Sequence, residues 1–214
     1  MAKKKNNYKV ILFDFDGTLA DTIELVRTVS NELSEIYHFK KVQPEEVRVL
    51  KKLDLKGFTK YLGIKKRYLP IILAKGQLLF RRHLADIELF PDMSDVLRDL
   101  KSKGFRLGIL TSNDEHNVKQ FLEQNNLKNH FDFVYAGAKL GGKAHHLKMI
   151  RRRHKLRRTE LLYVGDEIRD VKASHRARID IAAVSWGFNT QERLEMLKPK
   201  FLLKEPKQLL ETLS

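Results

Sequence analysis

The sequence of 214 residues contains no cysteine. Without a thiol, the chain can form no disulfide, no thiolate nucleophile and no zinc–thiolate site. The absence fits a reducing cytoplasm, although many secreted bacterial proteins also lack cysteine. We therefore expect a cytoplasmic protein.

Long apolar runs are missing as well. After a lysine-rich start, the apolar run at Val10–Phe13 stops at two nearby aspartates. A signal peptide needs a longer apolar segment, and a membrane span needs about 20 apolar residues. We expect neither, and no membrane partner. Hydrophobic residues still make up 42% of the chain, which is enough for one large domain, or for one core with a smaller insert.

Acidic residues are scarce relative to basic ones. The chain has 27 Asp and Glu against 42 Lys and Arg, which gives a formal net charge of +15. Such a surface attracts anions in general, including phosphorylated metabolites, nucleic acids and acidic proteins. We favour a solvated, lysine-rich surface over a functional contact with nucleic acid.

Short apolar segments with a strand-like composition alternate with helix-like segments. They lie at residues 8–13, 105–110, 131–136, 161–164 and 179–184, with a sixth at 201–203. Near-continuous apolar runs are typical of parallel strands that are buried on both faces. Together with the helices between them, they predict an α/β fold with a doubly wound parallel sheet.

Residues 21–84 interrupt this alternation. The segment shows no strand-like run and is predicted to form helices at 21–37, 44–53, 55–61 and 66–83. Pro44 followed by two glutamates is a helix-start signal. A helical stretch of this length is too long for a plain crossover between strands. We predict a small helical domain at 21–84, inserted into a core domain formed by 1–20 and 85–214.

Two carboxylates directly follow the first predicted strand. Asp14 and Asp16 lie two positions apart and would point to one side of a continued strand. Gly17 then permits a tight turn, and Thr18 supplies a hydroxyl. In open parallel sheets, ligands bind outside the carboxyl ends of the strands.

Further carboxylates follow the fourth predicted strand. Asp166 and Asp170 would lie at the same edge of the sheet as Asp14. Crowded carboxylates repel one another, and a hard cation relieves that repulsion. Magnesium prefers a few carboxylates together with water and a phosphate oxygen. The acidic cluster therefore predicts a Mg²⁺ site.

The segments after the second and third strands are less specific. Thr111 offers a hydroxyl, and the amides that follow, at Ser112 and Asn113, can face a phosphate at a helix N-terminus. Read alone, these residues would be a plain helix cap. The segment Gly141-Gly142-Lys143 lacks the pattern of a nucleotide P-loop, and Lys143 alone could be another surface lysine.

In this order, the four segments resemble the motifs of the haloacid dehalogenase-like hydrolases. They read DFDGTLADT from Asp14, LTSN ending at Asn113, GGK ending at Lys143, and VGDEIRD ending at Asp170. The resemblance covers almost the whole chain. The later segment VSWGFNT (184–190) and the helical insert after the first motif look like the phosphoglycolate phosphatase-like subgroup, in which the insert is a small cap domain.

The resemblance implies a phosphatase with assigned catalytic roles. Asp14 would be the nucleophile that forms an aspartyl-phosphate, and Asp16 would protonate the leaving oxygen and then activate water. Thr111 and Lys143 would bind phosphoryl oxygens and offset their charge. Among the residues that the motifs contain, Gly17, Thr18, Ser112 and Asn113 are the candidates for further phosphate contacts.

The resemblance also implies the metal ligands. Mg²⁺ would be held by Asp14, by the main-chain carbonyl of Asp16 and by Asp166, with Asp170 supporting or joining this shell. Many members of the family have a proline soon after the third-motif lysine, whereas Ala144 follows Lys143 here.

The substrate stays open at this point. A small phosphorylated metabolite, similar to phosphoglycolate, is the default of the subgroup. Asp16 argues against a dehalogenase and against a phosphonoacetaldehyde-type enzyme. The resemblance implies that neither of these relatives has an acidic residue at the position of Asp16. A β-phosphoglucomutase-like phosphotransferase keeps both acids and is an alternative. A catalytically silent binding protein is disfavoured because all the motif carboxylates are present.

A second alternative is a phosphatase that acts on nucleotide or nucleic-acid phosphate ends. Residues 143–158 contain eight lysines or arginines, three histidines and no acid. They could guide a phosphate backbone toward the site, but no aromatic residue interrupts the run to stack on bases. We favour a basic surface helix and its following loop. We expect a monomer or a homodimer.

Overall fold

The computed structural model describes residues 7–53, 55–83, 86–137 and 142–213. The chain forms two compact units: Thr22–Ile87 makes up one, and the chain up to Asp21 together with Glu88–Ser214 makes up the other. The boundary predicted between residues 84 and 85 falls on two residues outside the described ones. Each unit is described here by itself.

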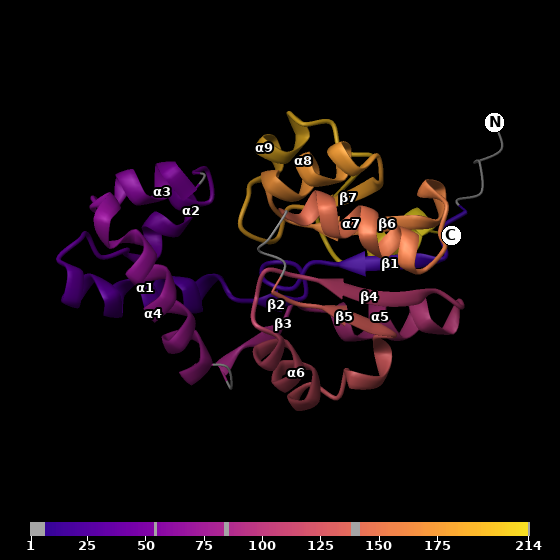
Figure 1. Ribbon diagram of the computed structural model, residues 1–214, viewed down its shortest axis with the longest axis horizontal. Helices are drawn as coiled ribbons and strands as arrows, with labels where there is room; N and C mark the ends of the chain where they lie inside the picture. Colours follow the sequence, from indigo (N-terminus) through magenta and orange to yellow (C-terminus); the bar gives the residue numbers. More distant parts are fainter. Residues whose placement is uncertain (1–6, 54, 84–85, 138–141, 214) are drawn as a thin grey trace. The chain divides into compact units, whose positions relative to one another are not determined.

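The larger unit contains a six-stranded parallel sheet with the order β5-β4-β1-β6-β7-β8 (Figure 1). Its strands are β1 (Val10–Phe13), β4 (Arg106–Leu110), β5 (Phe133–Tyr135), β6 (Leu161–Gly165), β7 (Asp180–Val184) and β8 (Phe201–Leu203). Each strand lies where the apolar segments predicted one, with ends that differ by at most two residues. The predicted α/β fold with a doubly wound parallel sheet is confirmed.

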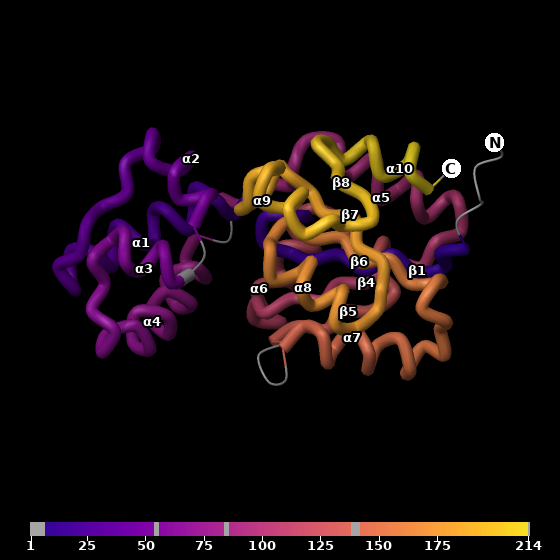
Figure 2. Tube along the Cα trace, turned by 90° about the horizontal axis from the view of Figure 1, so that it is seen from above, coloured from indigo at the N-terminus to yellow at the C-terminus, as the bar shows by residue number. Residues whose placement is uncertain are grey.

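Helices cover both faces of this sheet, which explains why every residue of β1 and β6 is buried. In Figure 2, α7 (Gly142–Arg153) and α8 (Ile168–Ala177) lie on one side of the sheet, and α5 (Met93–Ser102) and α10 (Gln208–Leu213) lie on the other. Side chains of alternate strand positions pack with α7 and α8 in one hydrophobic cluster that includes Val10, Leu12, Tyr163, Leu147, Ile150 and Val171. The unit also contains α6 (Glu115–Gln124) and α9 (Gln191–Glu195).

The strand order places a ligand site beside β1. From β1 the chain proceeds to β4 and β5 on one side, and then crosses to β6, β7 and β8 on the other. The loops that follow β1, β4 and β6 therefore meet at the carboxyl edge of the sheet. A reversal of strand order is where open α/β sheets bind ligands.

A two-stranded ribbon was not predicted from the sequence. Strand β2 (Ala20–Asp21) pairs antiparallel with β3 (Glu88–Leu89). The helix predicted to begin at Asp21 in fact begins at Ile23. A two-residue strand is stabilised by its distant partner rather than by local sequence, so its pattern was not recognisable.

Among its described residues, the smaller unit contains helices joined by loops and turns. It contains α1 (Ile23–Tyr37), α2 (Val47–Leu50), α3 (Leu55–Tyr61) and α4 (Leu69–Arg82), with short 3-10 helices at Pro44–Glu46 and Lys66–Tyr68. Helices α1 and α4 pack through Val29, Leu33 and Ile72. Within the described parts of the whole chain, none of the helices has both the length and the apolar character needed to cross a bilayer.

Candidate active site

Loops from three neighbouring strands bring polar side chains to the carboxyl edge of the sheet. Strand β1 ends at Phe13 and is followed by Asp14. Strand β4 ends at Leu110 and is followed by Thr111, and Gly165 at the end of β6 is followed by Asp166. Because β4 and β6 pair with β1 on its two sides, these positions are adjacent in space although they are far apart in the sequence.

Three buried carboxylates converge at this edge. Asp14, Asp166 and Asp170 each offer one oxygen, and these oxygens lie within 4.8 Å of one another. Asp166 and Asp170 are fully buried, and Asp14 is 3% exposed. Asp14 Oδ1 accepts a hydrogen bond from the main-chain N–H of Phe15 at 2.9 Å, which fixes the orientation of its carboxylate.

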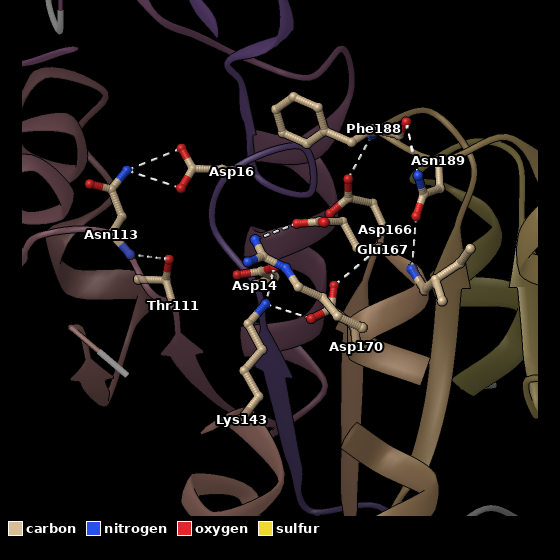
Figure 3. A network of polar contacts seen from close by, with 12 residues as sticks. Asp14, Asp16, Thr111, Asn113, Lys143, Asp166, Glu167, Asp170, Phe188 and Asn189 are labelled. Carbon is tan, nitrogen blue, oxygen red and sulfur yellow. Dashed lines mark hydrogen bonds and ion pairs between the residues drawn. The ribbon is translucent and has the colours of Figure 1, made fainter. Parts of the chain in front are cut away.

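Lys143 is buried among these carboxylates. It lies in the first turn of α7, and its Nζ forms an ion pair with Asp14 Oδ2 and a hydrogen bond of 2.5 Å with Asp170 Oδ1 (Figure 3). The interpretation of Lys143 as a surface lysine is therefore excluded. Gly142 is described and begins α7, whereas Gly141 lies outside the described residues.

Asp166 is held by the turn that follows β1 and by the segment after β7. Thr18 Oγ1 donates a hydrogen bond to Asp166 Oδ1 at 2.9 Å, and the main-chain N–H of Phe188 donates to Oδ2 at 2.6 Å. Gly17 has a φ of 72°, and a Cβ there would lie 2.3 Å from Asp166 Oδ2. Thr18 and Gly17 thus support the carboxylate cluster directly.

Asp16 points away from this cluster. Its two carboxylate oxygens accept hydrogen bonds from Asn113 Nδ2 at 3.1 and 3.0 Å, and Figure 3 shows the side chain turned toward Asn113. The expectation that Asp14 and Asp16 share one side of a continued strand does not hold, because β1 ends at Phe13. In the loop that follows, the two side chains take different directions.

The segment after β4 contains the hydroxyl of Thr111 and the main-chain amide of Asn113, which are hydrogen-bonded to each other. Thr111 is buried, and its Oγ1 accepts a hydrogen bond from the main-chain N–H of Asn113 at 3.0 Å. A hydroxyl that already accepts still has its own proton to donate. Ser112 lies between them and is half-buried. The Asn113 amide, one of the amides expected to face a phosphate, is directed at Thr111 in this structure.

Burial dominates the electrostatics of the site. It raises the pKa of Asp14 to about 7, while the charge of Lys143 acts in the opposite direction. Burial also raises the pKa of Asp166 well above its usual range, and the charges of Glu167 and Asp170 add to this effect. Burial alone would lower the pKa of Lys143, but the charges of Asp14 and Asp170 outweigh it and raise that pKa.

These carboxylates fit a divalent cation. When ionised, the three groups would carry three negative charges in a region shielded from water, where Lys143 supplies one positive charge. Burial first, and then neighbouring carboxylate charge, raise the pKa values of Asp14 and Asp166, so the ionised forms of these groups need a compensating cation. Oxygen donors of this kind, close enough to share one ion, suit Mg²⁺.

Several residues of the site were not assigned from the sequence. Glu167 lies beside the cluster, where burial raises the pKa of its carboxyl and the neighbouring charge of Arg169 lowers it. Asn189 Oδ1 accepts from the main-chain N–H of Ile168 at 2.8 Å, and Trp186 Nε1 donates to the carbonyl of Thr18 at 3.1 Å. The segment 184–190 did carry a signal, because it was part of the resemblance to the phosphatase subgroup.

Comparisons with known proteins agree with this fold. Residues 11–184 match the family model described as haloacid dehalogenase-like hydrolase. A phosphoglycolate phosphatase from Synechococcus elongatus is 30% identical over 206 residues, covering 96% of this chain and 97% of that protein. The pyrophosphatase PpaX of Bacillus thuringiensis is 27% identical over 208 residues, covering 95% of each chain.

A solved structure shows the same fold. The haloacid dehalogenase-like family protein from Streptococcus pneumoniae superposes with a TM-score of 0.85 at 20% identity, covering 97% of this chain and 99% of the other. The chain belongs to the haloacid dehalogenase-like hydrolase family. Within that family it is a phosphatase of the phosphoglycolate phosphatase-like subgroup.

Proposed function

We propose that this enzyme hydrolyses the phosphate monoester of a small metabolite in a Mg²⁺-dependent reaction, through an aspartyl-phosphate on Asp14. The main support is the arrangement around Asp14: a buried carboxylate beside the ammonium of Lys143 and within 4.8 Å of two further carboxylates. An anion such as a phosphoryl group could enter such a site only if cations offset its charge.

Asp14 and Asp16 take complementary roles in this reaction. An oxygen of Asp14 forms a bond to phosphorus as the bond from phosphorus to the leaving oxygen breaks. Asp16 gives its proton to that leaving oxygen. In the second step Asp16 takes a proton from water, which attacks the phosphorus and releases Asp14 and inorganic phosphate.

Thr111 and Lys143 are the proposed phosphoryl contacts. The proton of the Thr111 hydroxyl can be donated to a phosphoryl oxygen because its oxygen already accepts from Asn113. The Lys143 ammonium has three protons, of which two are used by Asp14 and Asp170. The third can bind a phosphoryl oxygen. Ser112 and the Gly17 turn stay predicted phosphate contacts.

Mg²⁺ would be held by Asp14, by the main-chain carbonyl of Asp16 and by Asp166, with Asp170 supporting or joining this shell. When bound, the ion supplies charge neutralisation for the phosphoryl oxygens. Asp170 Oδ1 already binds Lys143, and its Oδ2 accepts from the main-chain N–H of Glu167 at 3.1 Å. This pattern favours a supporting role for Asp170.

The names of the curated relatives guide the choice of substrates. The relative from Synechococcus elongatus is called a phosphoglycolate phosphatase, and the relative from Bacillus thuringiensis is called a pyrophosphatase. We propose a phosphoglycolate-like monoester as the substrate class and include pyrophosphate in the test. We propose that the helical unit Thr22–Ile87 is the cap domain, which the sequence predicted at residues 21–84. The cytoplasmic location and the monomeric or homodimeric state stay predictions.

The contacts of the basic segment 143–158 support a nucleic-acid substrate less than they support a small phosphate monoester. Lys143 is buried in the site, Arg151 donates to the carbonyl of Leu156 at 3.0 Å, and Arg157 pairs with Glu160 at 3.0 Å. These three cations are used within the protein. Retention on heparin across a salt series tests the others, because genuine phosphate contacts weaken steeply as salt rises.

The decisive experiment is a phosphate-release screen with Mg²⁺ and with a chelator. It covers phosphoglycolate, other alkyl phosphates, phosphorylated sugars, nucleotides, pyrophosphate and p-nitrophenyl phosphate. We expect release from small monoesters that disappears with the chelator and in Asp14→Asn. Undiminished activity of Asp14→Asn would show that the nucleophile is wrongly assigned. Activity confined to oligonucleotide ends would favour the nucleic-acid alternative.

A further inference from the structure

The side chain of Asn113 contacts both carboxylate oxygens of Asp16. Its Nδ2 lies 3.1 Å from one carboxylate oxygen of Asp16 and 3.0 Å from the other, although the two residues are 97 positions apart. Figure 3 shows this pair facing each other, apart from the group formed by Asp14, Lys143 and Asp170. The proposed acid and the proposed nucleophile are therefore held by different partners.

The amide of Asn113 is itself fixed in one orientation. Its Oδ1 accepts from the main-chain N–H of Asp114 at 2.7 Å and from Asn117 Nδ2 at 2.9 Å. Turning the amide over would place its NH₂ group against two donors and its oxygen against the carboxylate of Asp16. Only the present orientation satisfies all these contacts.

Asn117 holds this amide from behind. It lies in the first turn of α6 and is 2% exposed. Within the described parts of the chain, its Oδ1 has no hydrogen-bond partner although it is buried. A buried amide oxygen without a partner lowers stability, and an apolar residue would avoid that cost. The contact of its NH₂ group with Asn113 is the observed interaction that an apolar residue would lose.

We propose that Asn113 and Asn117 are positioning residues that hold Asp16 on the leaving-group side of the phosphoryl transfer. The proposal rests on the proposed phosphatase function. In phosphoryl transfer the attacking and leaving oxygens are roughly in line with phosphorus between them. A group that protonates the leaving oxygen must therefore stand apart from the nucleophile. The direction that Asn113 imposes on Asp16, away from Asp14, meets this requirement.

The leaving group of the substrate provides a test that a merely structural role would not satisfy. An alkoxide is a poor leaving group and needs a proton as the ester bond breaks, whereas p-nitrophenolate leaves without one. General acid catalysis contributes about 10²–10⁴-fold to rates. Loss of the correct position of Asp16 should therefore slow alkyl phosphates far more than p-nitrophenyl phosphate.

The experiment compares kcat/KM for p-nitrophenyl phosphate with kcat/KM for the alkyl phosphate that the screen shows to be hydrolysed fastest, because kcat/KM reports the step that breaks the ester bond and not the later hydrolysis of the aspartyl-phosphate, which both substrates share. The variants are Asn113→Ala and Asn117→Leu, with Asn125→Ala as the matched control. Asn125 is the residue directly after the C-terminus of α6. Its Nδ2 donates to the carbonyl of Phe121 at 2.9 Å, outside the site. Circular dichroism and thermal unfolding show whether each variant is folded.

We expect Asn113→Ala to lower the alkyl-to-aryl ratio of kcat/KM by roughly 10-fold or more, as a partial or full loss of the contribution of general acid catalysis. Asn117→Leu should lower the ratio in the same direction by a smaller factor, and Asn125→Ala should leave it unchanged. An unchanged ratio in folded Asn113→Ala, whether kcat/KM stays the same or falls equally for both substrates, overturns the positioning role while the phosphatase function stands. If the wild-type enzyme hydrolyses neither ester, the proposed function fails, and this proposal fails with it.

Discussion

Lys143 Nζ lies 2.5 Å from Asp170 Oδ1, and both side chains are buried. The same ammonium is paired with Asp14. It therefore joins the loop after β1 to the first turn of α8, from the first turn of α7. Its positive charge offsets part of the negative charge of the carboxylates that would otherwise repel an anionic substrate.

Replacing Lys143 by methionine removes that charge while keeping most of the side-chain volume. We expect kcat to fall by about 10²-fold or more, as when one stabilising donor is lost at an electrostatic site. Breaking a buried ion pair also costs about 3–5 kcal/mol of unfolding free energy, because the partner charges are left uncompensated. Steady-state kinetics and chemical denaturation in chelator measure the two effects. Equal activity and stability in the variant would contradict both roles of Lys143.

Asp166→Asn separates metal binding from folding. For the wild type, Mg²⁺ at 100 times its Kd should stabilise the fold by about 2.7 kcal/mol, provided that the unfolded chain does not bind the ion. The variant should lose this stabilisation. Without metal it should be at least as stable as the wild type, because burial and neighbouring carboxylates disfavour the Asp166 charge.

Thermal unfolding with Mg²⁺ and with a chelator checks these expectations. Asp180→Asn is the matched control, since Asp180 binds Tyr8 and Lys200 in the larger unit. That variant should keep the full Mg²⁺ response. A response that persists in Asp166→Asn would place the metal elsewhere.

Gly17 and Gly63 have nearly equal φ angles, so alanine substitutions at the two positions separate the effect of steric crowding at the site from the effect of backbone strain. Gly17 has φ of 72°, and Gly63 has φ of 71°. A Cβ at Gly17 would lie 2.3 Å from Asp166 Oδ2, whereas a Cβ at Gly63 would meet nothing within 4 Å. Alanine at either position bears the left-handed strain of about 1–2 kcal/mol.

We therefore expect Gly63→Ala to lower stability by that amount and to leave kcat/KM within about twofold, because the strain alone does not reach Asp166. Gly17→Ala should be more destabilised and should lose most of its activity, since the added carbon displaces Asp166. Thermal unfolding and phosphate release measure the difference. Equal effects of the two substitutions would mean that Asp166 tolerates the displacement.

Glu160 links the start of β6 to Lys9 and gives the fold a defined acid sensitivity. Lys9 Nζ pairs with Glu160 Oε1 at 2.8 Å, and the main-chain N–H of Arg157 donates to Oε2 at 2.7 Å. The contact with Lys9 first, and then those with Arg157, lower the pKa of Glu160 from 4.5 to about 2.

A pKa that is lower in the folded state contributes stability above the unfolded value, and this contribution is lost as pH falls toward the folded value. The window for Glu160 thus runs from about pH 4.5 down to about pH 2. We expect Glu160→Gln to lower Tm at pH 7 and to reduce the fall in Tm between pH 5 and the most acidic pH at which unfolding is reversible. Parallel Tm profiles for variant and wild type would contradict this contribution.

The sequence by itself determined the larger features of this protein. The apolar segments predicted all six strands of the sheet, because a strand buried on both faces needs a nearly continuous apolar run. The positions of Asp14 and Asp166 directly after two such runs predicted their convergence, since parallel strands end at one edge. These are consequences of local pattern and of a simple topological rule.

Only the tertiary structure decided how the side chains are paired. Lys143 is buried against an aspartate 129 positions away, and Asn113 turns its side-chain amide to Asp16. Neither pairing has a local signature, because a lysine in a basic segment and an asparagine at a helix start are compatible with a solvated surface. The burial of Lys143 and the partners of Lys143 and Asn113 depend on how α7 and β4 pack against β1. That packing determines which charges lie close enough to compensate one another.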